Sequence, residues 1–111
     1  MRQAYIGVDV GTSSTRAGIF DETGNLLAFA RHPITIWQEA GDIVEQSSAD
    51  IWAACVAAVR AAMAEAAIAP ELVKGIGFDA TCSLVVLDKR GEPLTVSGSG
   101  EIGRASCRER V

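Results

Sequence analysis

A short run of small polar residues follows the first apolar stretch of the chain. Residues 5–20 read YIGVDVGTSSTRAGIF, which places an aspartate, a glycine and four hydroxyl side chains close together. The backbone N–H groups and hydroxyls of such a turn can form a concave nest that binds an anion. Asp9 would repel a bare phosphate but suits Mg²⁺, which binds through one or two carboxylates together with phosphate oxygens. Arg16 can add charge-assisted hydrogen bonds to phosphate. The remaining candidate residues of the nest are Gly11, Thr12, Ser13 and Ser14.

Three other interpretations of this stretch need to be considered. A P-loop requires Gly-x-x-x-x-Gly-Lys-Ser/Thr, and no lysine stands near Gly11. A dinucleotide-binding loop requires Gly-x-Gly-x-x-Gly at the start of a helix, whereas here the next segment is short and is closed by turn residues 21–25. Both of these are excluded by context. An ordinary polar hairpin turn stays open as the alternative to a site for phosphate and Mg²⁺.

Composition limits the class of protein. The chain has 111 residues, 49% of them hydrophobic, and a formal net charge of −4. This fits one domain with a hydrophobic core, and the lack of a basic stripe argues against nucleic-acid binding. Three cysteines without metal-binding spacing indicate a reducing compartment. Because we find neither a signal peptide nor the roughly 18 consecutive apolar residues that span a bilayer, we expect a cytoplasmic protein without membrane contacts.

The last residues of the chain differ from the rest. Residues 101–111, EIGRASCRERV, follow a Ser-Gly-Ser-Gly run and show no hydrophobic period. Back-translated, they resemble a sequencing-library adapter read in frame. We therefore predict an artefactual tail over 101–111, Cys107 included, and a natural part over 1–100. A basic C-terminal tail is the alternative.

The elements that must position the polar run are predicted from hydrophobic period and turn signals. A helix is expected to begin at a cap on Ser47 or Ser48, with Asp50 completing a weak capping box, Trp52 on its apolar stripe, and Pro70 as its stop. Short extended pieces are expected at 34–36 and 43–44. Strands are predicted over 4–10, 15–20, 26–32, 73–78 and 84–87.

The resulting order is β-β-β-α-β-β, an α/β arrangement. A meander followed by a helix and a returning strand is typical of one half of the ribonuclease-H-like, actin-like ATPase architecture, here truncated. It differs from the alternating β-α-β order of a doubly wound dinucleotide fold. Residues 20–27 (FDETGNLL) and 87–94 (LDKRGEPL) share an apolar-Asp-x-x-Gly-x-x-Leu frame. We interpret this as shared turn chemistry, with Asp accepting backbone N–H bonds and Gly supplying a positive φ, rather than as a duplicated unit.

The stretch GVDVGTSSTRAGIFDETG resembles the first phosphate motif of the sugar-kinase, actin and heat-shock-protein superfamily. Within it, the chain is similar to the FGGY family of carbohydrate kinases. The similarity continues through GDIVEQSSADIWAACVAAVR and VKGIGFDATCSLVVLDKRGEPL and covers residues 4–96. The segment GFDATCS looks most like the ribulokinase-type, pentulose-kinase branch. Residues 1–100 are thus identified as a partial N-terminal domain of this family.

The resemblance implies roles for particular residues. Asp9 would hold Mg²⁺ through water, the residues of the nest would surround the ATP phosphates, and Arg16 would help to balance phosphate charge. On the sugar side, the positions that contact substrate in the family are Thr81, Cys82 and Ser83, with Asp79 nearby. Asp79 as a strand-end cap and Cys82 as a small buried residue are the alternatives. Glu45 and Gln46 either support the strand above the site or lie in a solvated turn.

The resemblance also implies a reaction. The full-length parent would be an ATP-dependent kinase that phosphorylates a hydroxyl of a small-molecule sugar, a ribulose-like pentulose, with ATP and Mg²⁺ as cofactors. In the family the catalytic base and the adenosine pocket lie further along the chain, so we expect these 111 residues to be inactive alone and to expose apolar surface that invites aggregation. A non-catalytic actin-like nucleotide-binding module is the alternative. The identity of the pentulose and a homo-oligomeric state of the parent stay open.

Overall fold

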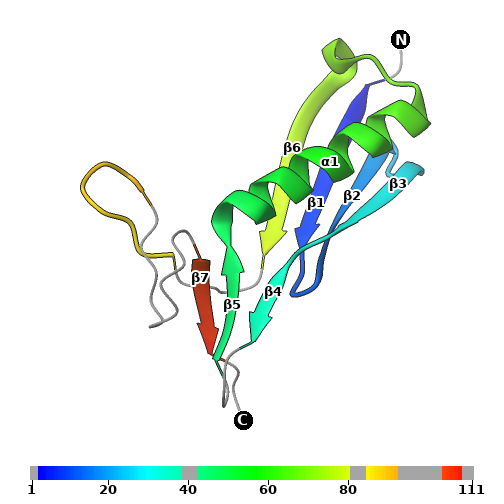
Figure 1. The fold of residues 1–111 in the computed structure, drawn as a ribbon. Coiled ribbons are helices and arrows are strands. Elements are labelled where there is room, and N and C mark those ends of the chain that lie inside the picture. The colour runs from blue at the N-terminus through cyan, green and yellow to red at the C-terminus, as the bar shows by residue number, and fades with distance from the viewer. Residues whose placement is uncertain (1–2, 39–42, 81–84, 93–103, 109–111) are drawn as a thin grey trace.

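The computed structural model describes residues 3–38, 43–80, 85–92 and 104–108 (Figure 1). These residues form two sheets and one long helix, with the four-stranded sheet in the order β3-β2-β1-β6 and the three-stranded sheet in the order β4-β5-β7. The elements are β1 (Ala4–Val10), β2 (Ser14–Asp21), β3 (Leu26–Pro33), β4 (Ile36–Gln38), β5 (Ile43–Ser47), α1 (Ser48–Ala66), a 3₁₀ turn (Pro70–Leu72), β6 (Val73–Ala80) and β7 (Arg104–Arg108).

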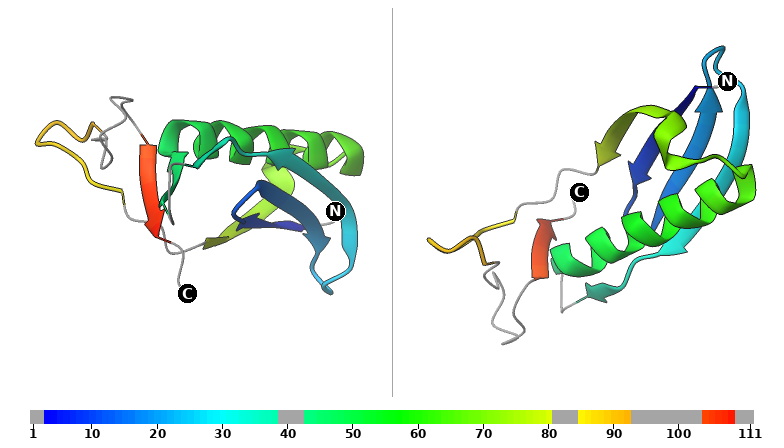
Figure 2. Two further views of the ribbon diagram at one scale, coloured as in Figure 1. Left: turned by 60° about the horizontal axis from the view of Figure 1, so that its bottom comes forward. Right: turned by 90° about the horizontal axis from the view of Figure 1, so that it is seen from above.

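The four-stranded sheet has the expected mixed topology. Strand β1 pairs antiparallel with β2, which pairs antiparallel with β3, while β6 returns parallel to β1. The two-residue period of β1 turns Ile6, Val8 and Val10 toward the core and leaves Tyr5 and Asp9 exposed. Helix α1 covers the face that these apolar residues form, and no element of the described part lies over the opposite face (Figure 2). The predicted actin-like α/β arrangement of a meander, a helix and a returning strand is therefore confirmed.

Helix α1 packs on the sheet through its smallest side chains. Ala54, Ala58 and Ala62 are fully or almost fully buried and repeat every four residues along one face, which lets the helix approach the strands closely. The prediction that Trp52 lies on the apolar stripe that packs into the core is wrong, because Trp52 is 64% exposed. It lies beside the alanine stripe, where it lines a shallow hollow with Ile76 and Phe78 of β6.

The ends of α1 agree only in part with the sequence prediction. Ser47 is the N-cap, since its Oγ accepts the backbone N–H of Asp50 at 3.2 Å. The Asp50 carboxylate does not complete a capping box but accepts the N–H of Thr35 at 2.7 Å. The helix ends at Ala66, because Ala67 takes the left-handed conformation with φ 55°. Pro70 begins the 3₁₀ turn instead of ending the helix.

Other predicted segments differ from the structure. The extended piece expected at 43–44 lies within β5, whereas the piece expected at 34–36 overlaps β4 only at Ile36. The two strands pair with each other over 36–38 and 44–46. The strand expected over 84–87 is wrong for the described residues 85–87, which form only an isolated bridge at Leu87, because a strand needs a neighbour along its whole length. Leu84 lies outside the described residues. Segment 104–108 pairs with β5 as β7; the origin of residues 101–111 stays a prediction.

Both edge strands of the four-stranded sheet carry exposed apolar side chains. Leu26 and Phe29 project from β3, and Ile76 and Phe78 project from β6, each at least half exposed or nearly so. Strands β3 and β6 are the two edge strands of this sheet, and among the described residues no further strand pairs with the free edge of β6. The expectation of exposed apolar surface is confirmed, and aggregation stays a prediction. Within the described ranges no helix is long and apolar enough to cross a membrane.

Candidate functional site

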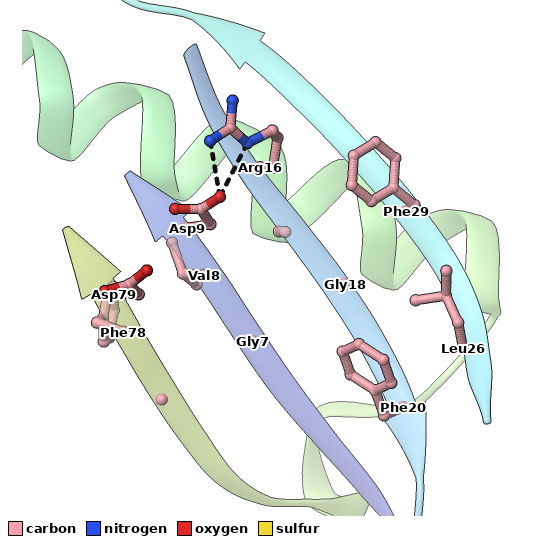
Figure 3. Close-up of a pocket in the computed structure, with 12 residues that line it drawn as sticks. Gly7, Val8, Asp9, Arg16, Gly18, Phe20, Leu26, Phe29, Phe78 and Asp79 are labelled. Atoms are coloured by element: carbon pink, nitrogen blue, oxygen red, sulfur yellow. Dashed lines mark hydrogen bonds and ion pairs between the residues drawn. The ribbon is translucent and has the colours of Figure 1, made fainter. Parts of the chain in front are cut away.

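The candidate site lies on the uncovered face of the four-stranded sheet, at the carboxyl ends of β1 and β6. The strand register places Asp9 of β1 opposite Arg16 of β2 and beside Asp79 of β6. All three line an open cavity of about 660 Å³ (Figure 3). Asp9 and Asp79, which are 70 positions apart in the sequence, thus lie with Arg16 at one rim of the cavity. Ligands of open α/β sheets commonly bind outside the carboxyl ends of parallel strands.

The floor of the cavity is largely backbone. Gly7 pairs with Gly18 on one side and with Gly77 on the other, so three neighbouring strands lack side chains at the same level. A Cβ atom at Gly18 would lie 2.9 Å from Cε1 of Phe20. Phe20 and Phe29 flank this row (Figure 3). The cavity therefore has a backbone floor flanked by aromatic side chains, below a charged rim.

Asp9 and Arg16 form an ion pair at the rim. Arg16 donates to Oδ2 of Asp9 from Nη2 at 2.7 Å and from Nε at 3.2 Å, and it donates from Nη1 to Oγ of Ser14 at 3.1 Å. The side chains are 29% exposed for Arg16 and 52% for Asp9. Pairs exposed to this extent contribute only about 0.2–1 kcal/mol to stability. The pair serves chiefly to orient both groups.

The guanidinium of Arg16 lies against the start of the turn between β1 and β2. A Cβ atom at Gly11 would be 2.7 Å from Nη2 of Arg16 and 3.1 Å from the carbonyl oxygen of Ser14. The backbone N–H of Gly11 donates to that same carbonyl at 2.9 Å and so closes the turn. Glycine at position 11 is therefore what allows Arg16 to reach Asp9 across the turn.

The carbonyl groups in the middle of this turn are held from outside it. The oxygen of Thr12 accepts Nε2 of Gln46 at 2.6 Å, and the oxygen of Ser13 accepts the backbone N–H of Ile34 at 2.9 Å. Within the part of the chain that the structure describes, the backbone N–H groups of Thr12 and Ser13 donate to no acceptor. Two amide donors therefore remain for a ligand next to Asp9 and Arg16. This arrangement fits the anion nest expected from the sequence.

The structure brings together all the candidate residues of the phosphate side in one hairpin: Asp9, Gly11, Thr12, Ser13, Ser14 and Arg16. On the sugar side it places Asp79 in β6, one residue before the strand ends. Thr81, Cys82 and Ser83 lie outside the described residues. Sequence reasoning left Gln46 between a supporting role and a solvated turn; its side chain is buried and touches the turn.

A hairpin loop of this kind at the end of a strand, on a mixed sheet covered by one helix, is the arrangement of an actin-like half-domain. The profile of the FGGY family of carbohydrate kinases, N-terminal domain, matches residues 4–105. The chain belongs to this family. The match ends within segment 101–111, whose interpretation as a tail stays a prediction.

Named relatives agree with this assignment. An FGGY carbohydrate kinase domain-containing protein of Homo sapiens is 50% identical over 100 residues, which are 90% of this chain and 18% of that protein. D-ribulokinase of Saccharomyces cerevisiae is 51% identical over 83 residues, 75% of this chain and 12% of that protein. The structure of xylulose kinase from Rhodospirillum rubrum superposes with a TM-score of 0.76 at 23% identity, over 96% of this chain and 20% of that one, and shows the shared fold. The chain spans a fifth or less of each of these proteins.

Proposed function

We propose that this chain is the N-terminal part of an ATP-dependent kinase that phosphorylates a hydroxyl group of a pentulose. The observation that carries the proposal is the turn between β1 and β2, whose central carbonyls are held from outside while the amides of Thr12 and Ser13 stay available. An anion suits those amides, and the guanidinium of Arg16 supplies positive charge beside them. The similarity to D-ribulokinase supports a pentulose as the acceptor.

The residues of the hairpin fit both ATP phosphates and Mg²⁺. The amides of Thr12 and Ser13, with the hydroxyls of the turn, would hold phosphate oxygens. Asp9 contacts Arg16 through Oδ2 only, and Figure 3 shows its second oxygen directed away from Arg16. That oxygen would bind Mg²⁺ or its water shell. When bound, Mg²⁺ neutralises charge on the transferring phosphate.

The sugar side of the site begins at Asp79. Its carboxylate lies one strand away from Asp9 on the same face and lines the same cavity. An ionised carboxylate accepts hydrogen bonds from hydroxyl groups, so Asp79 would orient sugar hydroxyls near the phosphate, together with the predicted contacts from Thr81, Cys82 and Ser83. The acceptor hydroxyl needs a base, which we place elsewhere in the parent protein; losing a general base costs about 10²–10⁴-fold in rate. A cytoplasmic location is part of the same proposal.

A titration of the ¹⁵N-labelled chain tests the phosphate site. Addition of Mg²⁺ and tripolyphosphate should shift the backbone N–H signals of the turn, Thr12 and Ser13 above all, and should leave signals of the Asp88 turn in place. Asp9→Asn should remove the part of the affinity that depends on Mg²⁺. Unmoved signals at millimolar tripolyphosphate would rule out the site.

A turnover assay tests the remaining part of the proposal. The 111-residue chain with ATP, Mg²⁺ and D-ribulose should release no ADP above the rate of an Asp9→Asn control. Steady release of ADP together with ribulose phosphate would show that the chain contains its own base. A full-length parent that binds ATP but phosphorylates no pentulose would instead support the non-catalytic nucleotide-binding module.

A further inference from the structure

A glutamine from the three-stranded sheet contacts the turn between β1 and β2. Gln46 lies next to the end of β5, and its side chain is only 2% exposed. Its Nε2 donates to the carbonyl oxygen of Thr12 at 2.6 Å, across 34 residues of sequence. A buried side-chain amide is costly unless it is hydrogen-bonded. The position of Gln46 is therefore tied to that of the turn.

Because of the geometry of the peptide group, this contact also sets the direction of the N–H of Ser13. The carbonyl of Thr12 and the N–H of Ser13 belong to one peptide group, and no cis peptide bond occurs among the described residues. In a planar trans peptide the carbonyl and the N–H point in opposite directions. When Gln46 holds the oxygen of Thr12, it therefore fixes the N–H of Ser13 to point away from β5.

A second contact fixes the next peptide group. The N–H of Ile34 donates to the carbonyl of Ser13 at 2.9 Å, and the N–H of the following residue, Thr35, donates to the carboxylate of Asp50 in the first turn of α1 at 2.7 Å. Ser47, adjacent to Gln46, caps the same helix. Gln46 and Ile34, the two residues that hold the turn, are thus both tied to the start of α1: Gln46 is adjacent to the N-cap Ser47, and Ile34 is adjacent to Thr35, which is bonded to Asp50.

We propose that Gln46 is a positioning residue for the phosphate site. Its side chain orients the peptide between Thr12 and Ser13 so that the N–H of Ser13 faces the phosphate, without contacting the ligand itself. This inference rests on the proposed function, since it assigns Gln46 to the same site. A side chain of the same length without the donor would let the peptide rotate and would lose a directed hydrogen bond to phosphate.

The test uses two variants of the full 111-residue chain, Gln46→Met and Gln46→Glu. Methionine keeps the length and removes both polar atoms, while glutamate keeps the shape but cannot donate to the oxygen of Thr12. Each should weaken binding of Mg²⁺-tripolyphosphate by about tenfold, the usual effect of losing one charge-assisted hydrogen bond, and should shift the free-state N–H signal of Ser13. Gln3→Met makes the same chemical change at an exposed position and should leave both readouts unchanged.

The outcomes separate this inference from the proposed function. If the unsubstituted chain does not bind tripolyphosphate, the phosphate site itself is overturned. If it binds, but both Gln46 variants bind with unchanged affinity or only melt at a lower temperature, Gln46 is merely structural. A measurement without variants covers the case in which the variants do not fold. During titration of the unsubstituted chain, the side-chain NH₂ signal of Gln46 should shift in step with the N–H of Ser13, and an unmoved Gln46 signal at saturation overturns the inference.

Discussion

The two ends of strand β2 carry turns whose backbone groups are satisfied in different ways. At the end shared with β3, the Asp21 carboxylate accepts the backbone N–H groups of Thr23 and Asn25, both at 2.9 Å, and the side chain of Asn25 at 3.1 Å. At the end shared with β1, the central carbonyls are held by Gln46 and Ile34, which come from outside the turn. The turn between β2 and β3 uses its own donors internally, whereas in the turn between β1 and β2 the N–H groups of Thr12 and Ser13 have no acceptor among the described residues.

This difference separates a structural turn from one that can receive a ligand. An aspartate at the first position of a turn consumes the N–H groups that follow it. In the turn after β1, the aspartate stands two residues earlier and is occupied by Arg16. Asp9 therefore does not accept the N–H groups of Thr12 and Ser13. The turn is held instead by residues from other elements, Gln46 and Ile34.

A third turn shows that the internal type is encoded locally. Asp88 accepts the backbone N–H groups of Arg90 and Glu92 at 2.8 and 3.0 Å, and Gly91 has φ 81°, close to the 87° of Gly24. The hypothesis that residues 20–27 and 87–94 share turn chemistry is confirmed for the described residues. The same turn joins two paired strands in one case and follows an isolated bridge in the other.

The largest loss of stability is expected at Gly11, at the start of the turn between β1 and β2. Gly11→Ala places a Cβ atom 2.7 Å from Nη2 of Arg16 and 3.1 Å from the carbonyl oxygen of Ser14. The guanidinium of Arg16 ends a flexible side chain and can swing away from Asp9, whereas the carbonyl of Ser14 is backbone and must shift. Overpacking against backbone costs about 1–3 kcal/mol. Urea unfolding should show the loss of stability. Gly77→Ala is the matched control, because no atom lies within 4 Å of its Cβ position, and it should be neutral; equal losses in both variants would contradict the close approach at Gly11.

The next largest loss of stability is expected in the turns in which Asp21 and Asp88 accept backbone N–H groups of their own turn. Gly24 and Gly91 both have positive φ, so alanine at either position is strained by about 1–2 kcal/mol. Gly24→Ala should lower the free energy of global unfolding by that amount, because its turn joins two strands of the main sheet. Gly91→Ala should lower it much less, since its strain is released by local opening. Matching losses in urea unfolding would show that both turns belong to one cooperative unit.

A smaller loss of stability is expected at Ser47, the N-cap of α1, which lies next to Gln46. Ser47→Ala removes the N-cap of α1, which typically costs about 1 kcal/mol, and it loosens the junction that holds Gln46. Ser48→Ala, in the first helical position, keeps the cap and is the control. Thermal unfolding should separate the two variants, and exchange of the backbone N–H of Ile34, which donates to the carbonyl of Ser13, should quicken only in Ser47→Ala. Unchanged exchange there would mean that the turn does not depend on the cap.

The parts of the fold that follow from local pattern could be predicted from sequence. The two-residue period of residues 4–10, the cap at Ser47 and the turn chemistry of Asp21 each depend on neighbours within a few positions. The hairpin that brings Asp9 and Arg16 together was predictable for the same reason, since the two residues lie in adjacent strands.

The remainder depends on contacts between distant segments. The hydrogen bond from Gln46 to Thr12 spans 34 residues and leaves no periodic trace in the sequence. The exposure of Trp52 follows from the alanines that face the sheet, which set the rotation of α1 about its axis. Asp79 meets Asp9 only because β6 returns parallel to β1 in that register. A sequence pattern predicts each strand but does not fix which residues become neighbours.

The smallest effect depends on pH and tests the internal turn directly. Hydrogen bonds from the backbone N–H of Asn25, the side chains of Thr23 and Asn25, and the backbone N–H of Thr23 lower the pKa of Asp21 from 3.8 to about 2. Because the folded pKa is below the unfolded one, the ionised carboxylate stabilises the fold above pH 4, and this contribution is lost as the pH falls toward 2. Asp21→Asn should therefore be less stable than the unsubstituted chain at pH 6, and the difference should shrink between pH 4 and pH 2. A difference for Asp21→Asn that does not vary with pH would mean that the turn is held by its backbone bonds alone, and the contrast with the ligand turn would then lie in geometry rather than in charge.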